Sequence, residues 1–452
     1  MNTVVSFPQV GDTEGKMEYY STNHISAAAD LKTAVLKGMP DDKGLYMPDD
    51  IPQMPPRFFE NIHKLGFHEI ATAVVLTLLG EDMPANELIR IVDESLNFVI
   101  PLVRLDDKRY ILELFHGPTL AFKDVGARFM ARLMGYYSKD SGRTLTVLVA
   151  TSGDTGSAVA DAFKGVEGIR VVLLYPSGMV SSLQERQLST QGSNIHALEV
   201  QGSFDDCQRL VKTAFGDTEL NEHLQLTSAN SINIARLIPQ SFYYFFAYAR
   251  LKAEAVNTVP LIAVPSGNLG NLTAGLIAKR MGLPVKRFIA ACNRNDSLTR
   301  YLKSGKYEPE ATIPTISNAM DVGDPSNFAR IRELYGHAVD FLRQDVFSAS
   351  FDDTATREMM RKIFHSCGYV LDPHGAVGLC ALEAYRQQDP ETPCICLETA
   401  HPAKFYDTVR ETLGTAPDIP EMLQEVMKKE KRATLLTAAY AEFRRFLLEK
   451  LP

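Results

Sequence analysis

The stretch His116-Gly-Pro-Thr-Leu-Ala-Phe-Lys-Asp-Val-Gly126 follows a β-rich run, residues 109–115, and opens a helix. Apolar residues beyond it recur at helical spacing to about Ser138, so the helix is expected to bury one face and hold its own start against the core. Lys123 therefore sits just ahead of the helix, which begins near Asp124, in a partly dry pocket that disfavours an ammonium and leaves an amine able to act as a base or a Schiff-base nucleophile. A lone lysine at a helix start is more often a solvated charge, so this assignment depends on what else lies beside it.

Size and composition narrow the possible functions. The chain has 452 residues, 45% of them hydrophobic, which is enough for one large core or two to three domains. A net charge of −8 argues against a nucleic-acid surface, and an anionic substrate would need local positive groups. The six cysteines lack zinc-site spacing and no paired-histidine motif occurs, so we expect no metal. Without a signal segment or a membrane-length apolar run, we expect a soluble, cytoplasmic protein that does not engage membranes, either a monomer or a homodimer.

After residue 99 the chain repeats one pattern, in which a short apolar strand meets a polar loop that opens a helix. The Lys123 stretch is the first such unit, and strands at 145–150, 261–264 and 394–397 begin the others. Serial strand–loop–helix units predict an α/β fold with parallel sheets and helices on both faces. Ligands of such sheets bind outside the carboxyl ends of the strands, so these loops are expected along one rim.

Two of these loops can bind anions. Residues 266–271 precede a helix, so free backbone N–H groups and close-approaching glycines suit a single phosphate rather than a nucleotide. Residues 151–156 offer hydroxyls and N–H groups where a carboxylate or a second anion could dock. A plain turn and a helix cap are the simpler interpretations of the two loops.

Two further sites add polar groups. Asn233 and Arg236 are spaced i,i+3 and could grip a phosphate, although a surface ion pair is the usual role of such an arginine. Thr399, directly after a strand, can hydrogen-bond a ring nitrogen or simply cap the next helix. A reactive lysine, a phosphate cradle and a hydroxyl for a heteroaromatic nitrogen together match pyridoxal phosphate.

The chain resembles the threonine synthase family of fold-type II pyridoxal-phosphate enzymes over nearly its whole length, from Tyr20-Ser-Thr22 to the C-terminal helix. The resemblance makes Lys123 the Schiff-base lysine and implies that Thr399 faces the pyridine nitrogen. The residues implied for the cofactor phosphate are Gly267, Asn268, Leu269, Gly270 and Asn271. Those implied for the substrate are Thr151, Ser152, Asp154 and Thr155, with Ser231, Asn233 and Arg236 for its phosphate.

The chain departs from the family pattern at three positions. His24 and Lys43 stand where the family has glycine, which bears on loop geometry in the N-terminal module. Asp154 stands where many fold-type II relatives have asparagine. An ionised carboxylate beside the cofactor's phenolate would be repelled, so we expect Asp154 to be turned away or protonated.

The resemblance also implies a domain plan. We expect a mixed α/β N-terminal module (1–98), a large cofactor-binding domain (99–140 and 250–420) and a small α/β domain (141–249). A C-terminal docking helix (421–452) would carry the apolar stripe Leu436, Tyr440, Phe443 and Leu447. Residues 312–327, rich in glycine, proline and asparagine, are expected to form a mobile segment near the mouth of the site.

The implied reaction converts O-phospho-L-homoserine and water to L-threonine and phosphate by β,γ-elimination and hydration. The nearest alternative is a related serine/threonine dehydratase or phospholyase. A non-catalytic, ligand-sensing descendant and a nicotinamide dehydrogenase are weaker alternatives, because the lysine and anion loops are intact and the GxGxxG fingerprint is missing.

Overall fold

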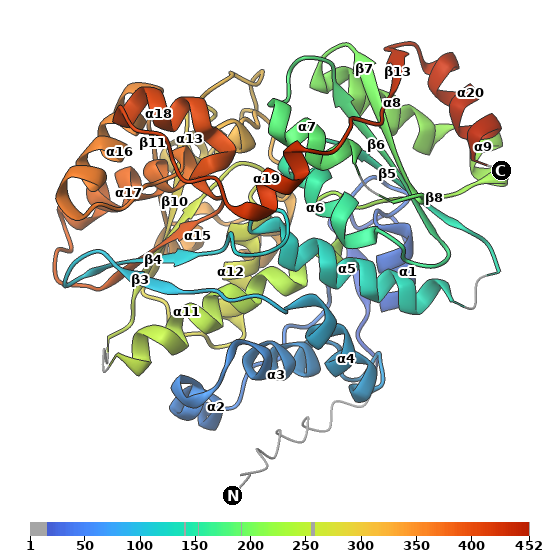
Figure 1. The fold of residues 1–452 in the computed structure, drawn as a ribbon. Coiled ribbons are helices and arrows are strands. Elements are labelled where there is room, and N and C mark those ends of the chain that lie inside the picture. Colours follow the sequence, from blue (N-terminus) through green and yellow to red (C-terminus); the bar gives the residue numbers. More distant parts are fainter. Residues whose placement is uncertain (1–15, 140–141, 152, 191, 255–257, 452) are drawn as a thin grey trace, which may run out of the picture.

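The computed structural model describes residues 16–139, 142–151, 153–190, 192–254 and 258–451. Two largely parallel sheets lie side by side, with α19 (Glu421–Met427) between them in Figure 1. The six-stranded sheet has the order β11 (Val346–Ser350), β10 (Arg287–Cys292), β9 (Leu261–Pro265), β12 (Cys394–Glu398), β4 (Arg109–Glu113) and β3 (Leu102–Arg104). The five-stranded sheet has the order β13 (Thr434–Thr437), β7 (Ile195–Gln201), β6 (Ile169–Pro176), β5 (Leu145–Ala150) and β8 (Gln225–Ser228).

Successive side chains along a strand point to opposite faces of each sheet, and both faces are buried. In β4, Ile111 packs into one apolar cluster, whereas its neighbours Tyr110 and Leu112 pack into another, since successive side chains point to opposite faces. In β5, Leu148 and its neighbour Val149 are divided in the same way. The predicted parallel sheets with helices on both faces are therefore confirmed.

Helices cover all four sheet faces. On the six-stranded sheet, α16 (Asp353–Cys367) and α17 (Pro373–Arg386) cover one face, and α11 (Phe242–Ala253) and α12 (Gly270–Arg280) the other. On the five-stranded sheet, α8 (Phe204–Gly216) and α20 (Tyr440–Lys450) oppose α5 (Lys123–Ser138) and α6 (Asp154–Phe163). The other helices after residue 140 are α7 (Ser182–Ser189), α9 (Thr218–His223), α10 (Ile234–Leu237), α13 (Ser297–Ser304), α14 (Phe328–Leu334), α15 (Val339–Asp345) and α18 (Tyr406–Leu413). Short 3₁₀ turns are η1 (Ile62–Lys64), η2 (Ile238–Ser241), η3 (Asn318–Met320) and η4 (Pro402–Phe405).

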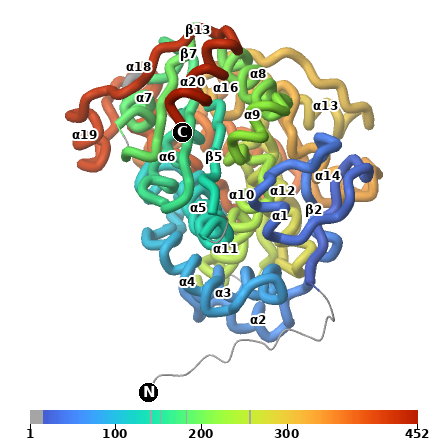
Figure 2. The backbone as a smooth tube through the Cα atoms, turned by 90° about the vertical axis from the view of Figure 1, so that its right-hand side faces the viewer, coloured from blue at the N-terminus to red at the C-terminus, as the bar shows by residue number. Residues whose placement is uncertain are grey.

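The N-terminal module is mixed, as expected. It contains the antiparallel pair β1 (Tyr19–Ser21) and β2 (Tyr46–Pro48) and the helices α1 (Leu31–Lys37), α2 (Pro56–Asn61), α3 (Phe67–Leu79) and α4 (Ala85–Ser95). Figure 2 shows α2, α3 and α4 at one end of the molecule. His24 and Lys43 both have left-handed backbone, with φ of 56° and 65°, at the positions where the family pattern has glycine.

The C-terminal segment differs from the expected single docking helix. Leu436 lies in β13, which pairs in parallel with β7, and only the rest of the apolar stripe belongs to α20. Phe443 and Leu447 are fully buried in the cluster over the five-stranded sheet. A four-residue strand carries too little periodicity to be found without its partner, which lies more than 200 residues earlier in the chain.

Candidate active site

The lysine stretch is fastened to the loop that follows β12. The Phe122 backbone N–H donates to the Thr399 carbonyl at 2.8 Å, and Ala121 bridges with Ala400. Lys123 is the first residue of α5, as the sequence predicts to within one residue. These contacts bring the predicted anchor and the predicted ring-nitrogen partner together.

The surroundings of Lys123 favour its neutral amine. The side chain is half-buried, and burial lowers the pKa of Lys123 below its ordinary value. The charges of Lys404 and Arg236 lower this pKa further, whereas Asp154 and Asp372 oppose the shift. An amine in such surroundings can act as a base or a nucleophile near neutral pH.

The predicted phosphate cradle joins β9 to α12. Leu269 has a left-handed backbone (φ 60°), which turns the chain into the helix and leaves the first N–H groups of α12 free. Asn271 Oδ1 accepts from the Tyr244 hydroxyl at 2.7 Å, while its Nδ2 is buried and has no partner among the described residues. An orphaned amide donor at a helix N-terminus fits a phosphate group.

Strand order brings the cofactor loops to one rim. β12 lies between β4 and β9 and is parallel to both, so the loops carrying Lys123, Thr399 and the cradle leave the sheet at the same edge. The donors, the hydroxyl and the amine at this rim fit pyridoxal phosphate. Lys123 would hold its aldehyde carbon, residues 267–271 its phosphate and Thr399 its ring nitrogen.

The loop after β5 is organised differently from expectation. Thr151 Oγ1 accepts from the backbone N–H groups of Gly153 and Gly156 at 3.0 and 2.8 Å, so its hydroxyl closes the loop instead of facing a ligand. Thr155 is half-buried in the first turn of α6. Ser152 lies outside the described residues.

The Asp154 carboxylate is buried and paired with a cation. Its Oδ1 lies 2.6 Å from Lys404 Nζ and accepts from Gln184 Nε2 at 3.0 Å. Burial alone would raise the pKa of Asp154, but the charges of Lys404 and Lys123 outweigh burial and hold that pKa below its ordinary value. Of the two expected states, turned away or protonated, the lowered pKa disfavours the protonated one, and the carboxylate instead pairs with Lys404, a buried ammonium that the sequence reading overlooked.

The loop after β8 divides its predicted residues between two roles. Asn233 caps α10 through Oδ1, which accepts from the Ala235 N–H at 2.9 Å, and its Nδ2 donates to the Val35 carbonyl at 2.9 Å. The expected substrate role of Asn233 is therefore corrected, since helix capping and contact with α1 use this amide. Asn230, in the same loop, has a buried Oδ1 without a partner in the described chain, which is an acceptor and suits a donor group rather than a phosphate.

Arg236 is only 3% exposed, so the expectation of an ordinary surface ion pair does not hold. Its Nη1 donates to the Ala229 carbonyl at 3.0 Å, and its buried Nε meets no acceptor in the described part of the chain. Burial lowers the pKa of Arg236 to about 10, which still leaves the guanidinium charged at neutral pH. A buried cation with an unused donor is suited to an anionic ligand.

Ser231 connects the phosphate cradle at 267–271 with the loop that follows β8. Its hydroxyl accepts from Asn268 Nδ2 at 2.5 Å, and Asn268 Oδ1 accepts from the Ser326 N–H at 2.6 Å. Asn268 is thus a link between the cradle, the β8 loop and the segment before α14. The sequence suggested no such connection, because the three segments are far apart in the chain.

Residues 312–327, expected to be mobile, are held by a polar network. Asn293 Nδ2 donates to Thr315 Oγ1 and Asp321 Oδ1, both at 2.8 Å, and the Ala319 N–H donates to His374 Nε2 at 3.2 Å. The segment also packs against the cradle, since a Cβ on Gly267 would lie 2.7 Å from Met320 Cα. The structure therefore fastens this segment over the site.

Arg330 is a second buried residue next to the site that the sequence did not predict. Its side chain is fully buried and donates to the Tyr46, Ser231 and Ile232 carbonyls and to Asn327 Oδ1. It joins the N-terminal module to the β8 loop. An arginine in a helical segment offers no sequence signal for such a role.

No group of three or more His, Cys, Asp or Glu side chains within the described ranges is arranged to hold a metal ion. All six cysteines are described and unpaired, and only Cys367 is exposed.

Comparison with known families gives two matches. Residues 98–424 match the model described as pyridoxal-phosphate dependent enzyme, and residues 18–96 match the threonine synthase N terminus. The two matches together cover the N-terminal module and both sheets, apart from β13.

Individual relatives agree with these models. A threonine synthase from Serratia marcescens is 42% identical, with 96% of this chain and 99% of that protein covered. The solved structure of a pyridoxal-phosphate-bound threonine synthase from Brucella melitensis is 36% identical, with a TM-score of 0.89 over 96% of this chain and 99% of that one. The Escherichia coli threonine synthase structure is 41% identical, with the same TM-score over 96% of this chain and 100% of that one. The chain therefore belongs to the threonine synthases within the pyridoxal-phosphate dependent enzymes.

Proposed function

We propose that this protein converts O-phospho-L-homoserine and water to L-threonine and phosphate. One observation carries the proposal: Lys123, Thr399 and the cradle at 267–271 follow three adjacent parallel strands in a chain of the threonine synthase family. When bound, pyridoxal phosphate supplies an electron sink for carbanion chemistry. The positions of the other polar groups support a phosphorylated amino acid as substrate.

The chain's own residues divide the remaining work. Lys123 Nζ is the base that removes a proton from the substrate's α carbon and, once it has passed that proton on, one from the β carbon; water then adds its hydroxyl at the β carbon, and protons return to the γ and α carbons. Arg236 binds the phosphate that leaves from the γ carbon, because its charge is buried and its Nε is otherwise unused. Ser231 belongs to the neighbouring loop after β8, and its hydroxyl, which accepts from Asn268, can still donate to the same anion.

A neutral hydroxyl at position 399 suits this reaction. Thr399 is 6% exposed and its hydroxyl bears no charge, so it does not hold a proton on the ring nitrogen as a carboxylate would. The electron sink is then weaker, which limits side reactions of the α carbanion and favours elimination toward the phosphate.

We further infer a division into 1–98, 99–140 with 250–420, 141–249, and 421–452, a cytoplasmic location, and a monomer or homodimer without nucleic-acid partners. The net charge of −8 supports the absence of nucleic acid. Within the described ranges, the model contains no helix of the length and apolar character needed to span a bilayer. Strands β5, β6, β7 and β8 all lie within the proposed unit 141–249, which supports the division.

The first prediction tests the reaction. Purified protein should show visible absorbance from the lysine-linked cofactor, and O-phospho-L-homoserine should change this absorbance while phosphate and threonine form in equal amounts. Lys123→Ala should lose the absorbance and lower turnover by more than about a thousandfold, since both base and anchor are removed. Lys279→Ala, which removes a lysine paired with Asp345 outside the site, is the matched control and should retain both.

Two outcomes would contradict this function. Full turnover in Lys123→Ala would remove the proposed base. Release of ammonia from threonine, with no phosphate from O-phospho-L-homoserine, would instead identify a dehydratase of the same cofactor class.

A further inference from the structure

A second buried lysine lies beside the site and has no part in the reaction described above. Lys404 is in η4, just after β12, and its side chain is 0% exposed. Its Nζ lies 2.6 Å from Asp154 Oδ1 and donates to the Thr119 carbonyl at 2.8 Å. The ammonium therefore spans three loops, one from the five-stranded sheet and two from the six-stranded sheet.

The position of Asp154 makes this contact consequential. Asp154 is 4% exposed and stands at the start of α6, and its charge acts on Lys123 more strongly than that of any other neighbouring acid or base. If no other cation were nearby, the buried Asp154 carboxylate would pair with the Lys123 ammonium, and Lys123 would keep its proton. With Lys404 in contact, Asp154 already has a partner, and Gln184 adds a neutral donor at 3.0 Å.

We propose that Lys404 is a positioning residue, which neutralises Asp154 and thereby leaves Lys123 free to exist as the neutral amine that the proposed function requires. The charged groups acting on Lys123 are Asp154 from α6, Lys404 from η4, Arg236 from α10 and Asp372 from the turn before α17. Asp372 has its own partners, since it accepts from His374 Nδ1 and from the Ala400 N–H. Lys404 is therefore the group that offsets the effect of the Asp154 charge on Lys123.

The contact with Thr119 gives Lys404 a second effect on geometry. Thr119 lies four residues before Lys123, and its own hydroxyl donates to Asp124 Oδ1 at 2.5 Å. The Lys404 ammonium thus holds the loop that presents Lys123 while it holds the start of α6. A methionine at position 404 would fill the space without either interaction.

The test measures the proton state of Lys123 directly. Full-length protein freed of cofactor is labelled with trace acetic anhydride across a pH series, and the peptide containing Lys123 is quantified by mass spectrometry. Lys404→Met should raise the pH of half-maximal labelling by about 1–2 units, because Asp154 then stabilises the Lys123 ammonium. The acid limb of kcat/KM in the holoenzyme should move in the same direction.

A double variant separates charge from shape. Asp154→Asn should lower the labelling midpoint of Lys123, since Lys404 and Arg236 then act on it without opposition from Asp154. The double variant Asp154→Asn with Lys404→Met should have a labelling midpoint close to that of the wild type. Lys404→Arg keeps the positive charge, so its midpoint should lie between those of the wild type and Lys404→Met. Lys279→Met removes an ion pair elsewhere and should leave the midpoint unchanged.

Three results would overturn the proposal: an unchanged midpoint in Lys404→Met, a double variant that keeps the raised midpoint, or an unchanged midpoint in Asp154→Asn. If Lys404→Met does not fold, Lys404→Gln and Asp154→Asn decide the question by the same criteria. The labelling midpoint needs no substrate. A failure of the wild-type protein to convert O-phospho-L-homoserine would therefore refute the proposed function while leaving this result readable.

Discussion

At the residue scale, burial decides which charged groups can do chemistry. The charges of Lys404 and Arg236 lower the pKa of Lys123, and those of Asp154 and Asp372 raise it. Lys404 is matched by Asp154, whereas Arg236 has a buried Nε without an acceptor in the described chain. The unmatched guanidinium is thus the group prepared for an incoming anion.

The second prediction follows from this imbalance. Arg236→Ala should raise the KM for O-phospho-L-homoserine and lower kcat, with a combined loss of about 10–150-fold in kcat/KM, as a charge-assisted hydrogen bond contributes about 1.5–3 kcal/mol. Steady-state kinetics measure the loss, and absorbance at saturating cofactor should be unchanged. Loss of bound cofactor instead would mean that Arg236 serves the cofactor phosphate.

At the element scale, short turns between strands and helices carry the function. The cradle between β9 and α12 needs Leu269 in a left-handed conformation and Gly267 in contact with η3. The Ala319 N–H in η3 donates to His374 Nε2, and the Ser317 carbonyl just before η3 accepts from Asn293 Nδ2 at 3.4 Å. The cradle therefore packs against a turn that is itself hydrogen-bonded to its surroundings.

The third prediction concerns this packing. Gly267→Ala would place a Cβ 2.7 Å from Met320 Cα and 3.0 Å from the Ala319 carbonyl oxygen, which forces the backbone to shift. Overpacking of this kind costs about 1–3 kcal/mol and should weaken pyridoxal-phosphate binding, measured by equilibrium dialysis. Gly216→Ala, where no atom lies within 4 Å of the added Cβ, is the control and should bind normally. Equal affinity in both variants would show that the cradle tolerates the shift.

At the scale of the whole molecule, the site lies between two sheets and depends on bonds that cross between separate segments. Lys404 joins the sheets through Asp154, and Arg330 joins the N-terminal module to the β8 loop. The apolar clusters extend from the N-terminal helices through α5 to both sheets. The cofactor loops, the substrate loops and the N-terminal module therefore contact one another directly through buried side chains.

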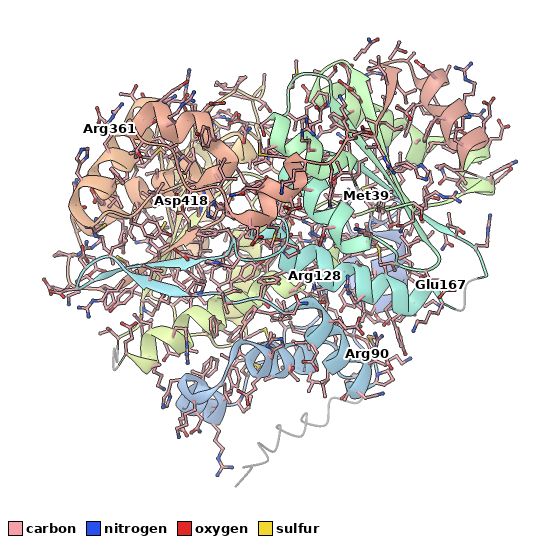
Figure 3. All side chains as sticks on the ribbon, in the orientation of Figure 1. Met39, Arg90, Arg128, Glu167, Arg361 and Asp418 are labelled. Atoms are coloured by element: carbon pink, nitrogen blue, oxygen red, sulfur yellow. The ribbon has the colours of Figure 1, made fainter. Side chains whose placement is uncertain are left out.

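The fourth prediction tests that coupling. Arg330→Met should lower the thermal unfolding midpoint strongly, with a loss of about 3 kcal/mol or more, because buried carbonyls lose their donors. It should also weaken cofactor binding through Asn327, which donates to the Asn268 carbonyl at 3.0 Å. Arg90→Met is the matched control: Arg90 lies at the surface on α4 (Figure 3) and only forms pairs with Glu87 and Glu94. A cost below about 1 kcal/mol is expected there, and an equal cost in both variants would contradict the role of Arg330.

The sequence by itself determined the parallel α/β fold, the loops at its rim and the cofactor, and it predicted where Lys123, Thr399 and the cradle would lie. These features depend on local patterns, namely strand periodicity, glycine-bearing turns and helix starts, which a linear reading contains. Tertiary structure alone decided the strand β13, the capping role of Asn233, the anchored segment 312–327 and the charge of Asp154. Each of these depends on a partner distant in the chain, such as β7 for β13 or Lys404 for Asp154, and burial and pairing exist only once the chain has folded.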